Sequence, residues 1–98
     1  MNCTFRIARP GEGDVAVTLE IFQDEDGSMI CGLRQLEGRI TLGPKAMRAA
    51  MLTELAKIED IARQAGCTEM RHAGEDRAWC LPGYEPMDGL RNGRRKRL

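Results

Sequence analysis

The sequence predicts a single α+β domain in which one long helix lies against a mixed β-sheet. Three observations lead to this prediction. Residues 44–65 show the apolar period of an amphipathic helix, several short segments alternate apolar and polar residues as strands do, and glycine or proline punctuates the connections. Ninety-eight residues allow one domain with a modest core.

The helix is predicted to begin at Pro44, because a proline in the first turn loses no hydrogen bond. Gly66 suits the left-handed position just past the helix end. Leu52 and Ile61 are expected to widen the buried face, and Glu59 and Arg63 have the spacing of an i,i+4 ion pair. One apolar stripe runs along the helix through Met47, Met51, Leu55, Ile58, Ala62 and Ala65.

Two strands are predicted before the helix region, at residues 3–8 and 15–22, where apolar and polar residues alternate. Residues 10–13 read as the turn between them. The acidic segment 23–27 is predicted to be a hairpin connection, since it lacks the ligand spacing of a calcium loop.

A third strand is predicted at residues 29–36, with Gly32 as a candidate bulge. Residues 37–38 read as a turn, and residues 39–42 as a short fourth strand. The second, third and fourth strands are then expected to form an antiparallel meander.

After the helix, residues 67–72 are predicted to form a strand parallel to residues 39–42, which makes a β-α-β crossover. A short polar segment follows. Residues 90–98 have the pattern of a last strand interrupted by Gly93.

The charge is distributed unevenly, although fifteen basic and fifteen acidic residues balance overall. Residues 1–90 carry a net charge of −5 and are expected to form the domain, while residues 91–98 form a basic tail or a last strand. Such a tail is either a solvated end or a contact for an anionic partner, namely nucleic acid, an acidic protein or another copy. The candidate partner-binding residues are Arg91, Arg94, Arg95, Lys96 and Arg97.

The sequence contains no apolar run long enough to span a membrane and no apolar segment typical of a signal peptide. The scattered cysteines, Cys3, Cys31, Cys67 and Cys80, are expected to be small buried hydrophobes in a reducing, cytoplasmic compartment. Cys67, His72 and Cys80 do not have the spacing of a common zinc site, so no metal is predicted.

Several segments resemble the GCN5-related N-acetyltransferase (GNAT) superfamily. They are the step Leu42-Gly43-Pro44, the helix end from Ala62 to Gly66, the triplet Gly83-Tyr84-Glu85 and the charged end Arg95–Leu98. The resemblance covers about residues 29–98. It implies a twisted mixed sheet with the long helix against one face.

The resemblance also implies where acetyl-CoA would bind, and there the sequence departs from the family. The family holds the pyrophosphate in a glycine-containing loop that opens this helix, whereas residues 45–50 contain no glycine. Lys45 and Arg48 are the candidate cofactor-binding residues.

The catalytic groups that the resemblance implies are also altered. Trp79 stands where many members have a tyrosine acid, and Tyr84 aligns with a structural aromatic residue. The catalytic candidates are Glu37, His72 and Tyr84, of which the first two would serve as bases.

These departures favour a non-catalytic GNAT-like interaction or assembly protein without a cofactor. It looks similar to small degenerate members encoded by tailed bacteriophages, where it would be a virion component or a modulator of a host factor. Its expected partner is a protein or another copy of itself, not a membrane, and its expected place is the cytoplasm or the phage particle. One alternative is a minimal acetyl-CoA-dependent N-acetyltransferase, and another is a nucleic-acid-binding protein that uses its basic tail.

Overall fold

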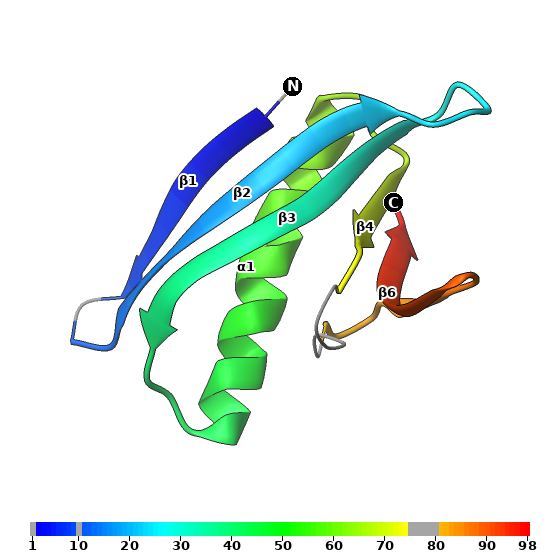
Figure 1. Cartoon of the computed structure of the whole chain (residues 1–98). Helices are drawn as coiled ribbons and strands as arrows, with labels where there is room; N and C mark the ends of the chain where they lie inside the picture. Colours follow the sequence, from blue (N-terminus) through cyan, green and yellow to red (C-terminus); the bar gives the residue numbers. More distant parts are fainter. Residues whose placement is uncertain (1, 10, 75–80) are drawn as a thin grey trace.

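The computed structural model describes residues 2–9, 11–74 and 81–98. In these residues one helix accompanies one six-stranded mixed sheet, so the predicted α+β class is confirmed (Figure 1). The sheet order is β1-β2-β3-β4-β6-β5. The elements along the chain are β1 (Asn2–Arg9), β2 (Gly13–Gln23), β3 (Met29–Ile40), α1 (Pro44–Gln64), β4 (Glu69–His72), β5 (Glu85–Met87) and β6 (Leu90–Arg97).

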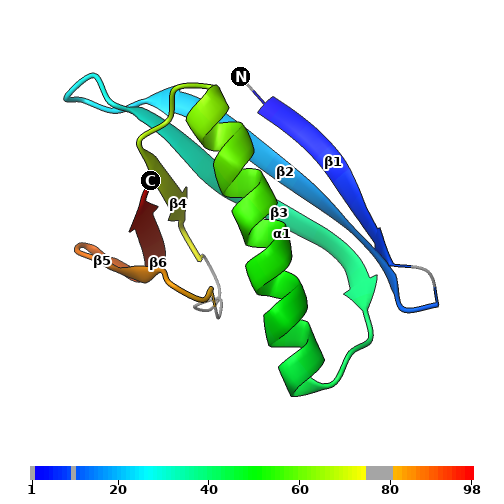
Figure 2. The same ribbon diagram turned by 180° about the vertical axis from the view of Figure 1, so that it is seen from behind.

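The helix α1 lies across one face of the sheet. Figure 2, seen from behind, shows α1 in front of the strands, whereas in Figure 1 it lies behind them. No described element covers the opposite face of the sheet, which is called the uncovered face below.

The meander consists of β1, β2 and β3, so the prediction of two separate strands at 29–36 and 39–42 is wrong. The expected turn at residues 37–38 is part of β3, where Gly38 pairs with Val15 at a φ of +115°. A Cβ on Gly38 would lie 2.3 Å from the carbonyl oxygen of Asp14. Glycine is therefore needed for a close approach inside the ladder and not for a reversal of the chain.

The β-bulge in this meander lies at Arg34, so the prediction of a bulge at Gly32 is wrong. Thr18 pairs with Gln35 whereas Leu19 pairs with Leu33, which leaves Arg34 as the additional residue on β3.

The strand that follows the helix, β4, pairs in parallel with the beginning of β3. Ile30, Cys31 and Gly32 are opposite Glu69, Met70 and Arg71, so the predicted pairing with residues 39–42 is wrong. The 21 residues of α1 span about 31 Å. This length returns the chain along most of β3, to the level of its first residues and not of its last ones.

The core lies between α1 and the sheet. Val17, Leu19 and Leu33 are buried on the sheet side. From the predicted helical stripe Leu55, Ile58 and Ala62 are buried, Met47 and Met51 are half-buried, and Ala65 is exposed.

One expectation about α1 needs correction, and another is confirmed. Leu52 and Ile61 are 47% and 49% exposed, so they flank the buried face and do not widen it. Gly66 has a φ of +88°, as expected for the residue that ends a helix in the left-handed region.

The basic segment at the C-terminus forms β6, which lies between β4 and β5. Gly93 does not interrupt this strand. Beyond it, the backbone N–H of Leu98 donates to the carbonyl of Thr68 at 3.0 Å. In the described part of the chain, no helix has the length and apolar character needed to cross a membrane.

Candidate functional site

An apolar cleft of about 190 Å³ lies between the first half of α1 and the meander. Its sheet side includes Ile7 and Val15, and its helix side includes Met47, Ala50 and Met51. Among the described residues that line the cleft, only Glu54 carries a charge. The cleft therefore offers hydrophobic contact and almost no polar chemistry.

The position of the cleft follows from how α1 packs. The buried residues of the helix are Leu55, Ile58, Glu59 and Ala62, all in its second half. In the first half, Met47, Ala50 and Met51 are only half-buried. The small side chain of Ala50 and the flexible side chains of the two methionines leave room that the core does not fill.

The cleft reaches the edge of the sheet at β1. Ile7 on β1 pairs with Val15 on β2, and both residues line the cleft. The opposite edge, β5, differs because it has three residues, one of which is Pro86. Proline and a short length both hinder pairing with a further strand, and β1, with eight residues, has neither between Asn2 and Arg9.

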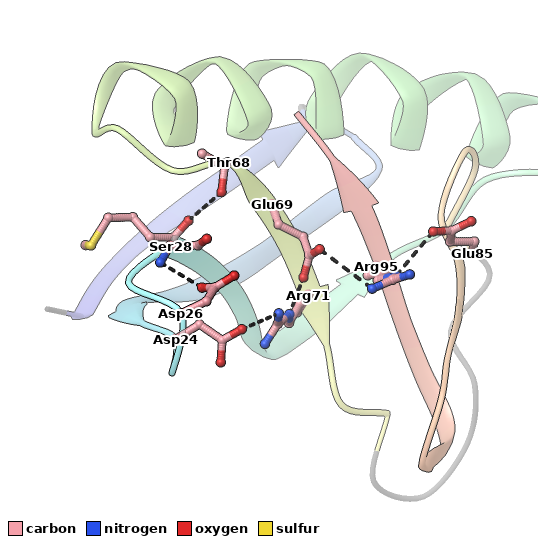
Figure 3. A network of polar contacts seen from close by, with 9 residues as sticks. Asp24, Asp26, Ser28, Thr68, Glu69, Arg71, Glu85 and Arg95 are labelled. Atoms are coloured by element: carbon pink, nitrogen blue, oxygen red, sulfur yellow. Dashed lines mark hydrogen bonds and ion pairs between the residues drawn. The ribbon is translucent and has the colours of Figure 1, made fainter.

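The uncovered face of the sheet carries a row of opposite charges (Figure 3). Arg71 on β4 contacts Glu69 and donates to Asp24 at 2.8 Å. Arg95 on β6 lies 4.0 Å from Glu69 and 3.2 Å from Glu85 on β5. The hydrogen bond from Arg71 lowers the pKa of Asp24, and Asp24 in turn raises the pKa of Arg71.

The row continues across the meander. Arg6 on β1 pairs with Asp14 on β2, and Arg34 pairs with Glu20 at 2.9 Å. The uncovered face is thus held together by ion pairs between neighbouring strands. The cleft side differs, because its lining residues are almost all apolar.

A partly buried polar cluster joins the second half of α1 to the end of the chain. Lys96 on β6 donates to Glu59 at 2.9 Å, and the hydroxyl of Tyr84 donates to the other carboxylate oxygen at 3.0 Å. Burial, and then the nearby Glu59 carboxylate, raise the pKa of Tyr84. The phenol therefore stays protonated and acts as a structural donor.

Glu59 was not identified as a site residue from the sequence. Its expected partner, Arg63, instead pairs with Asp60 at 2.9 Å. A signal was present, because Glu59 is a carboxylate within the apolar stripe, between Ile58 and Ala62. A charge at such a position needs a partner from another element.

His72, a candidate base, is buried where β3 and β4 cease to pair. Its Nδ1 lies 2.9 Å from the carbonyl oxygen of Leu33. A carbonyl only accepts, so Nδ1 carries the hydrogen. The His72 side chain thus bonds to the β3 backbone next to Gly32, the last β3 residue that pairs with β4. The other candidate base, Glu37, is exposed on β3 opposite Ala16.

Lys45 and Arg48, the candidate cofactor-binding residues, are exposed at the beginning of α1. The helix is regular from its first turn, since the N–H of Met47 already donates to the carbonyl of Gly43 at 2.8 Å. Alanine and methionine side chains occupy the positions where glycines would let a phosphate approach the backbone. These residues do not fit the pyrophosphate of acetyl-CoA.

The five basic candidates for partner binding have different surroundings in β6. Arg95 and Lys96 form the ion pairs described above. Arg94 donates to the carbonyl of Gly93 at 2.8 Å, and Arg91 and Arg97 are exposed. The structure therefore brings Lys96 and Tyr84 together through Glu59, and it separates the basic residues onto different faces of the sheet.

The cysteines follow the sequence prediction in part. Cys31 and Cys67 are buried, and burial raises the pKa of the Cys31 thiol to about 11. Cys3 is exposed, which corrects the prediction for that residue. Cys80 and Trp79 lie outside the described residues. Within the described ranges, no group of three or more His, Cys, Asp or Glu residues could hold a metal ion.

Comparison with known proteins adds no further assignment: no family model, curated protein or solved structure matches this chain.

Proposed function

We propose that this protein is a non-catalytic GNAT-like interaction protein whose cleft receives apolar side chains of a protein partner. The observation that carries the proposal is the cleft between α1 and the meander, with Glu54 as the charged residue among its described lining residues. A lining of this kind can exclude water from apolar groups. It does not bring together the acid and base that proton transfer needs.

The volume of the cleft favours side chains of a partner over a whole cofactor. Pockets for drug-sized ligands usually measure about 300–1,000 Å³, whereas this cleft measures about 190 Å³. Met47 and Met51, which are half-buried, can change rotamer to fit different apolar groups. The neighbouring β1 edge adds backbone groups that can pair with an extended segment.

The charged surfaces support this choice of site. On the uncovered face, Arg71 and Arg95 already have carboxylate partners within the sheet. Lys96 is directed to the buried Glu59. These contacts reduce the basic charge that β6 can offer to phosphates, which weakens the nucleic-acid alternative.

The GNAT-like part of the proposal rests on the arrangement of elements. A meander leads into one long helix, and the helix leads to a strand parallel to the last strand of the meander. A basic strand, β6, is the last in the chain and pairs with that parallel strand. These features support the resemblance noted in the sequence. The regular first turn of α1, which contains no glycine, supports a GNAT-like protein without the family's cofactor site.

The proposal can be tested with the neutral dye N-phenyl-1-naphthylamine, which fluoresces when it enters an apolar site. We expect the folded wild-type protein to bind the dye and Ala50→Lys to weaken binding at least tenfold, because Ala50 lines the cleft. Ala49→Lys is the matched control. Its position is adjacent and exposed, and the change in net charge is the same.

Two results would contradict the proposed site. One is the absence of dye fluorescence with wild-type protein that is folded by circular dichroism. The other is equal binding by both lysine variants, which would place the dye elsewhere on the molecule.

A further inference from the structure

The outer edge of β1 is an edge of the sheet in the described part of the chain, and it lies next to an apolar surface. Within the sheet β1 pairs only with β2, so one side of its backbone has no ladder partner among the described strands. Its described side chains are divided between the two faces. Cys3 and Ile7 lie opposite Leu19 and Val15 on the cleft side, and Thr4 lies opposite Thr18 on the uncovered side.

We propose that the partner of this edge is a second copy of the chain, and that two β1 strands pair antiparallel about Phe5. The two sheets then become continuous, and both α1 helices lie on the same face. This inference rests on the proposed function, because it names the partner that binds at the β1 edge beside the cleft. The preference for a second copy comes from the self-complementarity of β1.

The register follows from the order of residues along β1. Pairing about Phe5 uses residues 2–8 of both copies and places Cys3 opposite Ile7 of the second copy. Arg6 then lies opposite Thr4. Pairing about Arg6 would instead place two arginines opposite each other, which is unfavourable. Pairing about Thr4 would include only residues 2–6 of each copy, so the ladder would be shorter than with pairing about Phe5.

This register also keeps like surfaces together. Since residues opposite each other in a ladder share a face, Cys3 and Ile7 of both copies form one apolar strip beside the two clefts. The apolar strip continues onto the side of α1 that carries the cleft residue Glu54. Ile61, which is 49% exposed, is two helical turns beyond the cleft residue Glu54 on that flank.

Analytical ultracentrifugation over a concentration series can test the pairing through opposite charges at position 4. Because the dimer is two-fold symmetric, position 4 of each copy lies opposite Arg6 of the other, which gives two such contacts. We therefore expect Thr4→Glu to tighten the dimer and Thr4→Arg to weaken it, each by about 2-fold to 30-fold in Kd. Thr53→Glu and Thr53→Arg are the controls, because Thr53 is exposed on α1 away from the cleft, and neither should change the Kd.

A cross-link tests the register independently. In the variant Ile7→Cys, the introduced thiol lies opposite Cys3 of the other copy, so mild oxidation should give a disulfide-linked dimer. The two thiols of one copy are four strand residues apart, about 13 Å, and cannot bridge each other. The same change combined with Cys3→Ser should abolish this cross-link.

A protein that stays monomeric up to millimolar concentration, or a dimer that responds equally to both charges at position 4, would overturn the inference. Dye binding in a strictly monomeric protein would overturn only the second copy as partner and leave the cleft function standing. A dimer with the expected charge response but without dye binding would overturn the cleft function and retain the pairing.

Discussion

Lys96 on β6 and Glu59 on α1 form an ion pair of 2.9 Å between the last strand and the only helix of the described chain. Glu59 is 4% exposed, and the second oxygen of its carboxylate accepts from Tyr84. The pair therefore fixes the second half of α1 to the sheet at the position where a purely apolar stripe would be expected.

We expect Lys96→Met to destabilise the fold by about 1.5–3 kcal/mol, because it removes a charged hydrogen bond and leaves a buried carboxylate with Tyr84 as its partner. Lys57→Met is the control. Its exposed pair with Glu54, at 3.4 Å, should contribute less than about 1 kcal/mol. Urea unfolding of both variants measures the difference, and equal losses would show that Glu59 is solvated.

The two leucines of α1 provide a second comparison. Leu55 is 7% exposed and Leu52 is 47% exposed. Leu55→Ala should lower the free energy of unfolding by about 2–5 kcal/mol because it leaves a cavity in the core. Leu52→Ala should change it by less than about 1 kcal/mol. Thermal or urea unfolding would contradict the packing of α1 if Leu52→Ala proved the more harmful change.

Stability should decrease at alkaline pH because of Cys31. Burial raises its pKa from 9.0 to about 11, so the folded state retains a proton that the unfolded state loses. This contribution is complete below pH 9 and is lost by pH 11, which amounts to about 2–3 kcal/mol. The raised pKa of Tyr84 acts in the same direction at higher pH.

Urea unfolding between pH 8 and pH 11 would measure this loss. Cys31→Ala lowers stability at every pH, but it should reduce the slope with pH, since Cys67 and Tyr84 then supply the remainder. An unchanged slope in Cys31→Ala would contradict the assignment to Cys31.

Acetyl-CoA should bind more weakly than about 1 mM in isothermal titration. The reason is the regular first turn of α1, where side chains replace the glycines of a phosphate-binding loop. Lys45→Ala and Arg48→Ala should leave the result unchanged. Micromolar binding that these variants abolish, or acetyl transfer to an amine, would support the acetyltransferase alternative instead.

Features that depend on local sequence were predictable. The start of α1 at Pro44 and the left-handed Gly66 depend on backbone preferences of single residues. The alternation in β1 and β2 depends on the two-residue period of a strand. The burial of Leu55 followed from the helical period in the same way.

The candidate site was predictable only in part. The helical period predicts Met47 and Met51 on the apolar stripe, and the structure shows that they line a cleft because α1 packs tightly only from Leu55 onward. A helix has the same apolar pattern whether or not side chains of the sheet fill the space against it. Which half of the helix is filled depends on the volume of side chains from other strands.

By itself, the sequence determined the α+β class, the long helix and most strands, since these follow from residue order and backbone preference. Tertiary structure alone decided that Gly38 lies within a ladder, that β4 pairs with Ile30–Gly32, and that Glu59 bonds Lys96 instead of Arg63. The physical reason is that a close backbone approach, a strand register and a buried charge each depend on a group far away in the chain. Only the folded arrangement brings that group within contact distance.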